Sequence, residues 1–91
     1  ESAYVNQASD GVHTVTARAR IEDFNEEFGT GLGDDEYDTI GGLVSGELGR
    51  LPRLGEVVSL DDIQFTVIKS DRRRVYTLRA RLPGAPRVSS D

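Results

Sequence analysis

The spacing of apolar residues predicts a strand followed by a helix in the first third of the chain. Apolar and polar residues alternate over 12–18, which is typical of a half-buried strand. From Arg20 onward the apolar spacing changes to three and four residues, the period of a helix that buries one face. The apolar residues with this spacing are Ile21, Phe24 and Phe28. Because Gly29 follows as a helix stop, we expect a short amphipathic helix over about 20–28.

A second helix is predicted over about 38–49, and it is rich in glycine. Its apolar stripe consists of Ile40, Leu43, Val44, Leu48 and Leu51. Asp35 or Asp38 would cap its start, where the helix dipole favours negative charge, and Gly49 and Pro52 would end it. Each interior glycine costs a helix about 1 kcal/mol relative to alanine, so these glycines need a structural or functional reason.

Three more strands are predicted in the second half of the chain. They are GEVVSL, IQFTVIK with Ile63, Phe65 and Val67 on one face, and VYTLRARL with Tyr76, Leu78, Ala80 and Leu82 on one face. A tight turn at Asp61–Asp62 joins the first two, and SDRRR joins the last two into an antiparallel hairpin. The order β-α-α-β-β-β indicates an α+β two-layer sandwich, a mainly antiparallel four-stranded sheet with two helices on one face.

The composition is that of one small globular domain, which we expect over 12–82. Hydrophobic residues make up 36% and charged residues 30% of the 91-residue chain, and no apolar run approaches the roughly 18 residues of a membrane span. The absence of cysteine excludes disulfides and thiolate zinc sites. Residues 1–11 are expected to be an extended segment and residues 83–91 a flexible tail. A chain that starts at Glu1 and contains no methionine is interpreted as part of a longer protein.

Charge is unevenly distributed along the sequence. The net charge of −5 disfavours a generic phosphate-binding protein, and with it nucleic acid as a partner. Residues 22–38 hold eight acidic and no basic residues, whereas residues 69–81 hold six basic residues and one acidic residue. This asymmetry suggests a homodimer in which the acidic helical half of one copy faces the arginine hairpin of another.

Three glycines of the second helix are candidate interaction residues. Gly42, Gly46 and Gly49 fall together on a helical wheel, opposite the apolar stripe. Such a small face either lets another backbone pack closely within the domain or forms a contact for a partner domain or ligand. It is not a phosphate loop, because Glu47 follows Gly46 where such a loop needs lysine.

Arg72, Arg73 and Arg74 are the second candidate interaction group, at the tip of the last predicted hairpin. They form a solvated turn, or they contact an anionic membrane surface or the acidic half of a neighbouring subunit. Nucleic acid is disfavoured here too, because no aromatic residues interleave with the arginines.

The sequence offers no recognisable catalytic or metal site. His13 is the only histidine and has no nucleophile setting around it. The acidic run from Asp34 lacks the glycine and the final carboxylate of a calcium loop, so it indicates a helix start or, at most, a weak contact with a hydrated cation. We therefore expect no enzyme activity, no metal site and no cofactor.

Ordered motifs over residues 12–82 resemble a known family. They are YDTIGG over 37–42, GRLPRLGE over 49–56, FTV over 65–67 and ARIEDFNEEFG over 19–29, preceded by Ala17 and Arg18 where members often have Asp-Gly. Together they are similar to the transporter-associated domain at the C-terminus of CorC/HlyC proteins.

The resemblance implies a parent protein with an N-terminal membrane domain, a pair of CBS modules that bind adenine nucleotides, and this domain last. Such proteins are linked to magnesium and cobalt efflux, and some carry a haemolysin-like label. The implied role is a non-catalytic domain at the cytoplasmic face of the membrane that modulates ion transport. Two alternatives remain open: a sensor that binds an adenine nucleotide or a hydrated cation, and the C-terminal domain of a cation/proton antiporter.

Overall fold

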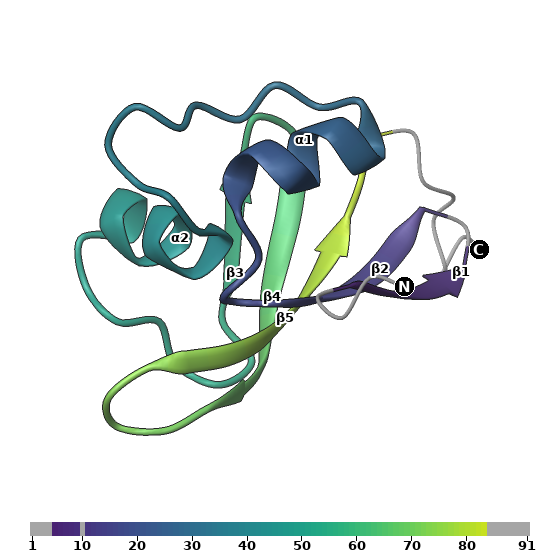
Figure 1. The fold of residues 1–91 in the computed structure, drawn as a ribbon. Helices are drawn as coiled ribbons and strands as arrows, with labels where there is room; N and C mark the ends of the chain where they lie inside the picture. The colour runs from purple at the N-terminus through teal and green to yellow at the C-terminus, as the bar shows by residue number, and fades with distance from the viewer. Residues whose placement is uncertain (1–4, 10, 84–91) are drawn as a thin grey trace.

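The chain forms a five-stranded antiparallel sheet that carries two short helices (Figure 1). A computed structural model describes residues 5–9 and 11–83. The elements are β1 Val5–Ser9, β2 Val12–Thr16, α1 Ile21–Phe28, α2 Ile40–Leu48, β3 Val57–Leu60, β4 Ile63–Ser70 and β5 Val75–Arg81. The strand order across the sheet is β1-β2-β5-β4-β3, so β2 and β5 pair although they are far apart in sequence.

The predicted α+β sandwich and the order β-α-α-β-β-β over β2 to β5 are confirmed. One further strand, β1, pairs antiparallel with β2 and brings the sheet to five strands instead of the four expected. This segment is expected to be extended, but its pairing cannot be predicted locally, because VNQAS has no apolar alternation to indicate a strand. Most of the predicted tail, residues 84–91, lies outside the described residues, as do residues 1–4 and Asp10.

The core lies between the helices and one face of the sheet. Its largest fully buried side chains are Phe24, Phe65, Ile21, Ile40, Ile63, Leu78, Val15, Val44 and Val67. The rings of Phe24 from α1 and Phe65 from β4 lie 5.8 Å apart between centroids. Burial of each such side chain contributes about 1.5–3 kcal/mol, so these residues fix both helices on the sheet.

The start of α2 differs from the prediction. Thr39, and neither Asp35 nor Asp38, is the N-cap: its Oγ1 accepts a hydrogen bond of 3.1 Å from the Gly42 N–H. Asp38 is one residue too early, and its carbonyl oxygen instead accepts a hydrogen bond from the Ile21 N–H at the start of α1. The predicted end is confirmed, since Gly49 has the left-handed φ of 84° that favours glycine.

Near the tip of the β4–β5 hairpin, two neighbouring residues lie on the opposite faces of the sheet from those that the alternation predicts. Tyr76, expected on the core face, is exposed, whereas Val75 is buried. The strand register shifts between Val67 and Lys69 and again before Ser70, and such bulges rotate the following side chains to the other face. The β3–β4 turn has positive φ at both Asp61 and Asp62, as a tight two-residue hairpin requires.

Candidate functional site

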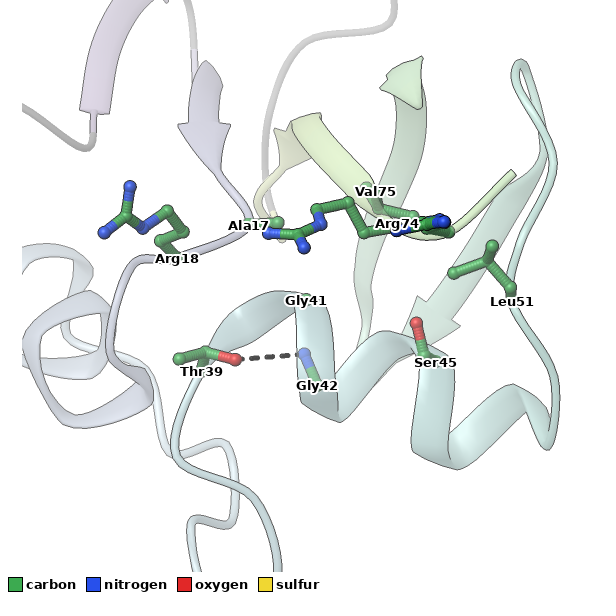
Figure 2. Close-up of a pocket in the computed structure, with 10 residues that line it drawn as sticks. Ala17, Arg18, Thr39, Gly41, Gly42, Ser45, Leu51, Arg74 and Val75 are labelled. Carbon is green, nitrogen blue, oxygen red and sulfur yellow. Dashed lines mark hydrogen bonds between the residues drawn. The ribbon is translucent and has the colours of Figure 1, made fainter. Parts of the chain in front are cut away.

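A pocket of about 410 Å³ opens where three separate segments meet (Figure 2). These segments are the turn after β2, one side of α2 with the loop that follows it, and the end of the β4–β5 hairpin. The lining residues are Ala17, Arg18, Thr39, Gly41, Gly42, Ser45, Leu51, Arg73, Arg74 and Val75. The pocket therefore brings candidate interaction residues from both predicted groups, Gly42 with Arg73 and Arg74, to one place.

Gly41 sets the distance between two walls of this pocket. Its N–H donates a hydrogen bond of 2.9 Å to the Ala17 carbonyl oxygen, and the Ala17 N–H donates one of 2.9 Å to the Tyr76 carbonyl oxygen. A Cβ atom on Gly41 would lie only 2.7 Å from the Cβ of Ala17 and 3.0 Å from its carbonyl oxygen. A larger residue at this position would push α2 away from the turn after β2.

Gly46 and Gly49 are glycines for two different reasons. A Cβ on Gly46 would lie 2.1 Å from Cζ of Tyr37, so Gly46 makes room for that ring. Gly49 is the left-handed C-cap. Neither lines the pocket, and the same is true of Arg72, which is exposed at the hairpin tip.

Asp71 fixes the hairpin end that carries Arg73 and Arg74. Its Oδ1 accepts hydrogen bonds from the Arg73 N–H at 2.7 Å and the Arg74 N–H at 2.9 Å, and its Oδ2 accepts one from the Tyr76 hydroxyl at 2.6 Å. These bonds, led by the one from Tyr76, hold the pKa of the Asp71 carboxyl below its usual range. The bond to Asp71 also raises the pKa of Tyr76. The two arginines are thus held by a closed turn.

The positive charge of the pocket comes from guanidinium groups. Among the described residues that line it there are three arginines, Arg18, Arg73 and Arg74, and no acidic residue. The one ion pair found within residues 5–9 and 11–83 joins Arg50 and Glu56, outside the pocket.

The first backbone N–H groups of α2 are all occupied. Those of Ile40 and Gly41 donate to the carbonyl oxygens of Ala19 and Ala17, and those of Gly42 and Leu43 donate to the side chain and the carbonyl oxygen of Thr39. An anion in the pocket would therefore be bound by arginine side chains and not by the helix start.

Other residues of the recognisable motifs have structural roles. Arg50 binds Glu56 through both of its terminal nitrogens, and Glu56 Oε1 also accepts the Arg53 N–H at 2.9 Å. The hydrogen bond from Arg50, followed by that from Arg53, lowers the pKa of Glu56. The Asn25 side-chain amide donates from Nδ2 to the Leu32 carbonyl oxygen and accepts the Leu32 N–H at Oδ1, both at 2.9 Å, and so holds the loop after α1 against the helix.

The remaining candidates from the sequence lie apart from the pocket. The ring of His13 lies 4.5 Å from that of Phe28, and its buried Nδ1 has no hydrogen-bond partner among the described residues. The acidic run Asp34 to Glu36 is exposed. Within the part of the chain that the structure describes, no three His, Asp or Glu side chains are grouped so that they could hold a metal ion. No described helix is long and apolar enough to cross a bilayer.

Sequence reasoning did not identify Arg18, Thr39, Gly41 and Ser45 as site residues. They come from two segments that are brought to the hairpin only by the pairing of β2 with β5 and by the packing of α2. No local pattern in the sequence reports this juxtaposition.

Comparison with known proteins assigns the chain to a family. The family described as transporter associated domain, CorC_HlyC, matches residues 6–84. The magnesium and cobalt efflux protein CorC of Escherichia coli K12 is 48% identical over 77 residues, which are 85% of this chain and 26% of that protein. That of Vibrio cholerae is 42% identical over 89 residues, 98% of this chain and 31% of the relative. The chain thus spans about a quarter to a third of the length of these relatives.

Solved structures agree with this assignment. A CorC-associated region from Neisseria meningitidis has a TM-score of 0.82 at 45% identity, with 86% of this chain and 96% of that chain covered. A hemolysin domain from Enterococcus faecalis has a TM-score of 0.75 at 31% identity, with 86% of this chain and 95% of that chain covered. The chain belongs to the CorC/HlyC transporter-associated domain family.

Proposed function

We propose that this chain is a non-catalytic accessory domain of a CorC/HlyC-type divalent-cation transport protein and that it modulates magnesium or cobalt transport through domain or subunit contacts. The relatives that support this proposal are named for magnesium and cobalt efflux, and the chain matches 26% of the length of the Escherichia coli protein. These names favour a CorC-type parent over a cation/proton antiporter. The partners would be the CBS and membrane domains of the same protein, at the cytoplasmic face of the membrane.

The observation that carries the proposal is the separation of charge on the surface. Arg72, Arg73 and Arg74 are exposed at a hairpin that projects beyond the helices (Figure 1). Seven of the eight acidic residues in 22–38 are also exposed, on α1 and the loop before α2. Complementary charge patches orient partners as they meet and suppress wrong pairings, which suits a docking module. An acidic face of a neighbouring domain, a second copy, or an anionic membrane surface would meet the hairpin.

The mechanism that we propose is a shift between conformations of the transporter. A docked domain changes the balance between two states only if it contacts one state better than the other. A differential contact of about 1.4 kcal/mol changes the ratio of the states tenfold. A few charge-assisted contacts at the arginine hairpin are sufficient for an effect of this size.

The test is ion export by the full-length protein that carries this domain. The triple variant Arg72→Glu, Arg73→Glu, Arg74→Glu reverses the charge of the hairpin, and we expect it to change the rate of Mg²⁺ or Co²⁺ export in membrane vesicles. Arg79→Glu is the control for charge reversal elsewhere on the domain, because Arg79 is exposed on β5 outside the pocket. Equal export rates for the triple variant, the control and the unmodified protein would contradict the proposal.

A further inference from the structure

The arginine pocket has a charge opposite to that of the chain that forms it. The chain has a net charge of −5, yet Arg18, Arg73 and Arg74 line the pocket, and no Asp or Glu among the described lining residues offsets them. A concave positive surface on an acidic molecule concentrates anions locally. It also disfavours a hydrated cation as the occupant of this pocket.

The three guanidinium groups are available to an incoming ligand. None of them is in an ion pair with any residue of the described ranges 5–9 and 11–83. Arg74 instead lies 6.0 Å from the centre of the Tyr76 ring, a contact that leaves its N–H groups available. Each guanidinium has five donors in a planar fork that matches the oxygens of a phosphate or a carboxylate.

The rest of the lining suits a small organic anion. A volume of about 410 Å³ is within the range of small-molecule sites, roughly 300–1,000 Å³. Leu51 and Val75 supply an apolar part and Ser45 a hydroxyl group. A phosphate monoester, with two negative charges and three terminal oxygens, matches the neighbouring guanidinium groups of Arg73 and Arg74 better than a single carboxylate does.

The hairpin is fixed before any ligand arrives. Asp71 binds the N–H groups of Arg73 and Arg74 and the hydroxyl of Tyr76, so both of its oxygens are occupied, and it does not line the pocket. A site whose backbone is already in place loses less conformational entropy when the ligand binds.

We infer that the pocket between α2 and the β4–β5 hairpin binds a small phosphate monoester through Arg73 and Arg74, with Arg18 at its edge. The inference deepens the proposed function, because a ligand bound here would regulate the transporter to which the domain belongs. It rests on the proposed function for this regulatory effect, whereas the binding itself can be measured on this chain alone. The ester is either a free nucleotide-like metabolite or a lipid headgroup, since both present the same phosphate.

The test is a titration of the ¹⁵N-labelled 91-residue chain with AMP, with inorganic phosphate and with vesicles of phosphatidylcholine containing phosphatidic acid. We expect saturable amide shifts confined to Ala17, Arg18, Gly41, Gly42, Ser45 and the stretch 73–75. AMP alone producing them indicates a metabolite, and vesicles alone producing them indicate a headgroup. The inference would be overturned if neither AMP nor the vesicles produced these shifts, whether or not inorganic phosphate did. It would also be overturned if the shifts were spread over all basic residues.

A matched pair of variants makes the test specific. The double variant Arg73→Gln, Arg74→Gln should weaken binding about tenfold or more, because hydrogen bonds between charged partners are the strong ones. Arg72→Gln removes one positive charge from the same hairpin but outside the pocket, and it should change the affinity less than about twofold, the effect of one distant screened charge. Equal affinities for the double variant and the unmodified chain would overturn the inference. These exposed residues do not contribute to the core, and the dispersion of each spectrum checks the fold.

The outcome is separable from that of the export experiment. Binding of AMP with unchanged export in the hairpin variants would leave the pocket assigned and contradict the docking role. Changed export in the hairpin variants without binding of AMP or vesicles to the chain would support the docking role and contradict the assignment of the pocket.

Discussion

At the residue scale, three glycines of α2 and its C-cap have three different explanations. Gly41 lies against the backbone of Ala17, Gly46 against the ring of Tyr37, and Gly49 has a left-handed conformation. A helical wheel groups Gly42, Gly46 and Gly49 correctly by angle, but it contains no information about what packs on each of them. The cost of interior glycine in this helix is therefore offset by close contacts within the domain.

Gly41→Ala and Gly46→Ala should differ in their effect on stability. Gly41→Ala should lower the free energy of unfolding by about 1–3 kcal/mol, because the new methyl group meets the Ala17 backbone, which cannot move without shifting α2. Gly46→Ala should cost less, because the Tyr37 ring can rotate away. Urea unfolding followed by circular dichroism measures both. A gain of about 1 kcal/mol in both variants, the effect of helix propensity alone, would contradict this account.

Acid should weaken the fold through Glu56 and Asp71. Their pKa values are lowered in the folded chain, so the unfolded chain binds more protons as the pH falls. Their contribution is complete above the unfolded-state pKa, near pH 4, and is lost as the pH falls through the lower folded-state pKa. Glu56→Gln and Asp71→Asn should flatten the decline of the urea midpoint below about pH 5. If the urea midpoint of the variants fell with pH as steeply as that of the unmodified chain, Glu56 and Asp71 would not be the source of the acid sensitivity.

At the scale of elements, the sequence pattern predicted those helix ends and strand faces that depend on interactions between residues close together in the chain. The alternation of β4 and the ends of α1 at Gly29 and of α2 at Gly49 could be predicted because each depends on a few adjacent residues. The pairing of β1 and the exchange of Val75 with Tyr76 depend on partners across the sheet and on bulges. The pocket depends on three separated segments, so the arginines and Gly42 were predicted as two unconnected groups.

The N-cap of α2 gives a prediction at this scale. Thr39→Ala should lower the free energy of unfolding by about 1 kcal/mol, because the Gly42 N–H loses its side-chain acceptor. Thr39→Ser should restore most of the loss, and Asp38→Ala should have a smaller effect, because the Asp38 carboxylate does not cap the helix. Thermal unfolding compares the three variants. A larger loss for Asp38→Ala than for Thr39→Ala would assign the cap to the aspartate.

At the scale of the whole molecule, the separation of charge predicts salt-sensitive self-association. The acidic residues of 22–38 in one copy would face the arginines 72–74 of another, and exposed charges attract each other only within a Debye length of about 10 Å at 0.1 M salt. We expect sedimentation equilibrium of the 91-residue chain to show dimers at low salt that dissociate at high salt. A monomer at high protein concentration and low salt would contradict this homodimer.

We propose that this domain modulates transport and does not itself carry the ion. The most direct measurement is the rate of Co²⁺ export by the purified full-length protein in liposomes, with and without residues 12–82. We expect the truncated protein still to transport the ion, at an altered rate. An unchanged rate would mean that the domain has no part in transport, and complete loss of export by a correctly folded truncated protein would mean that it belongs to the ion pathway itself.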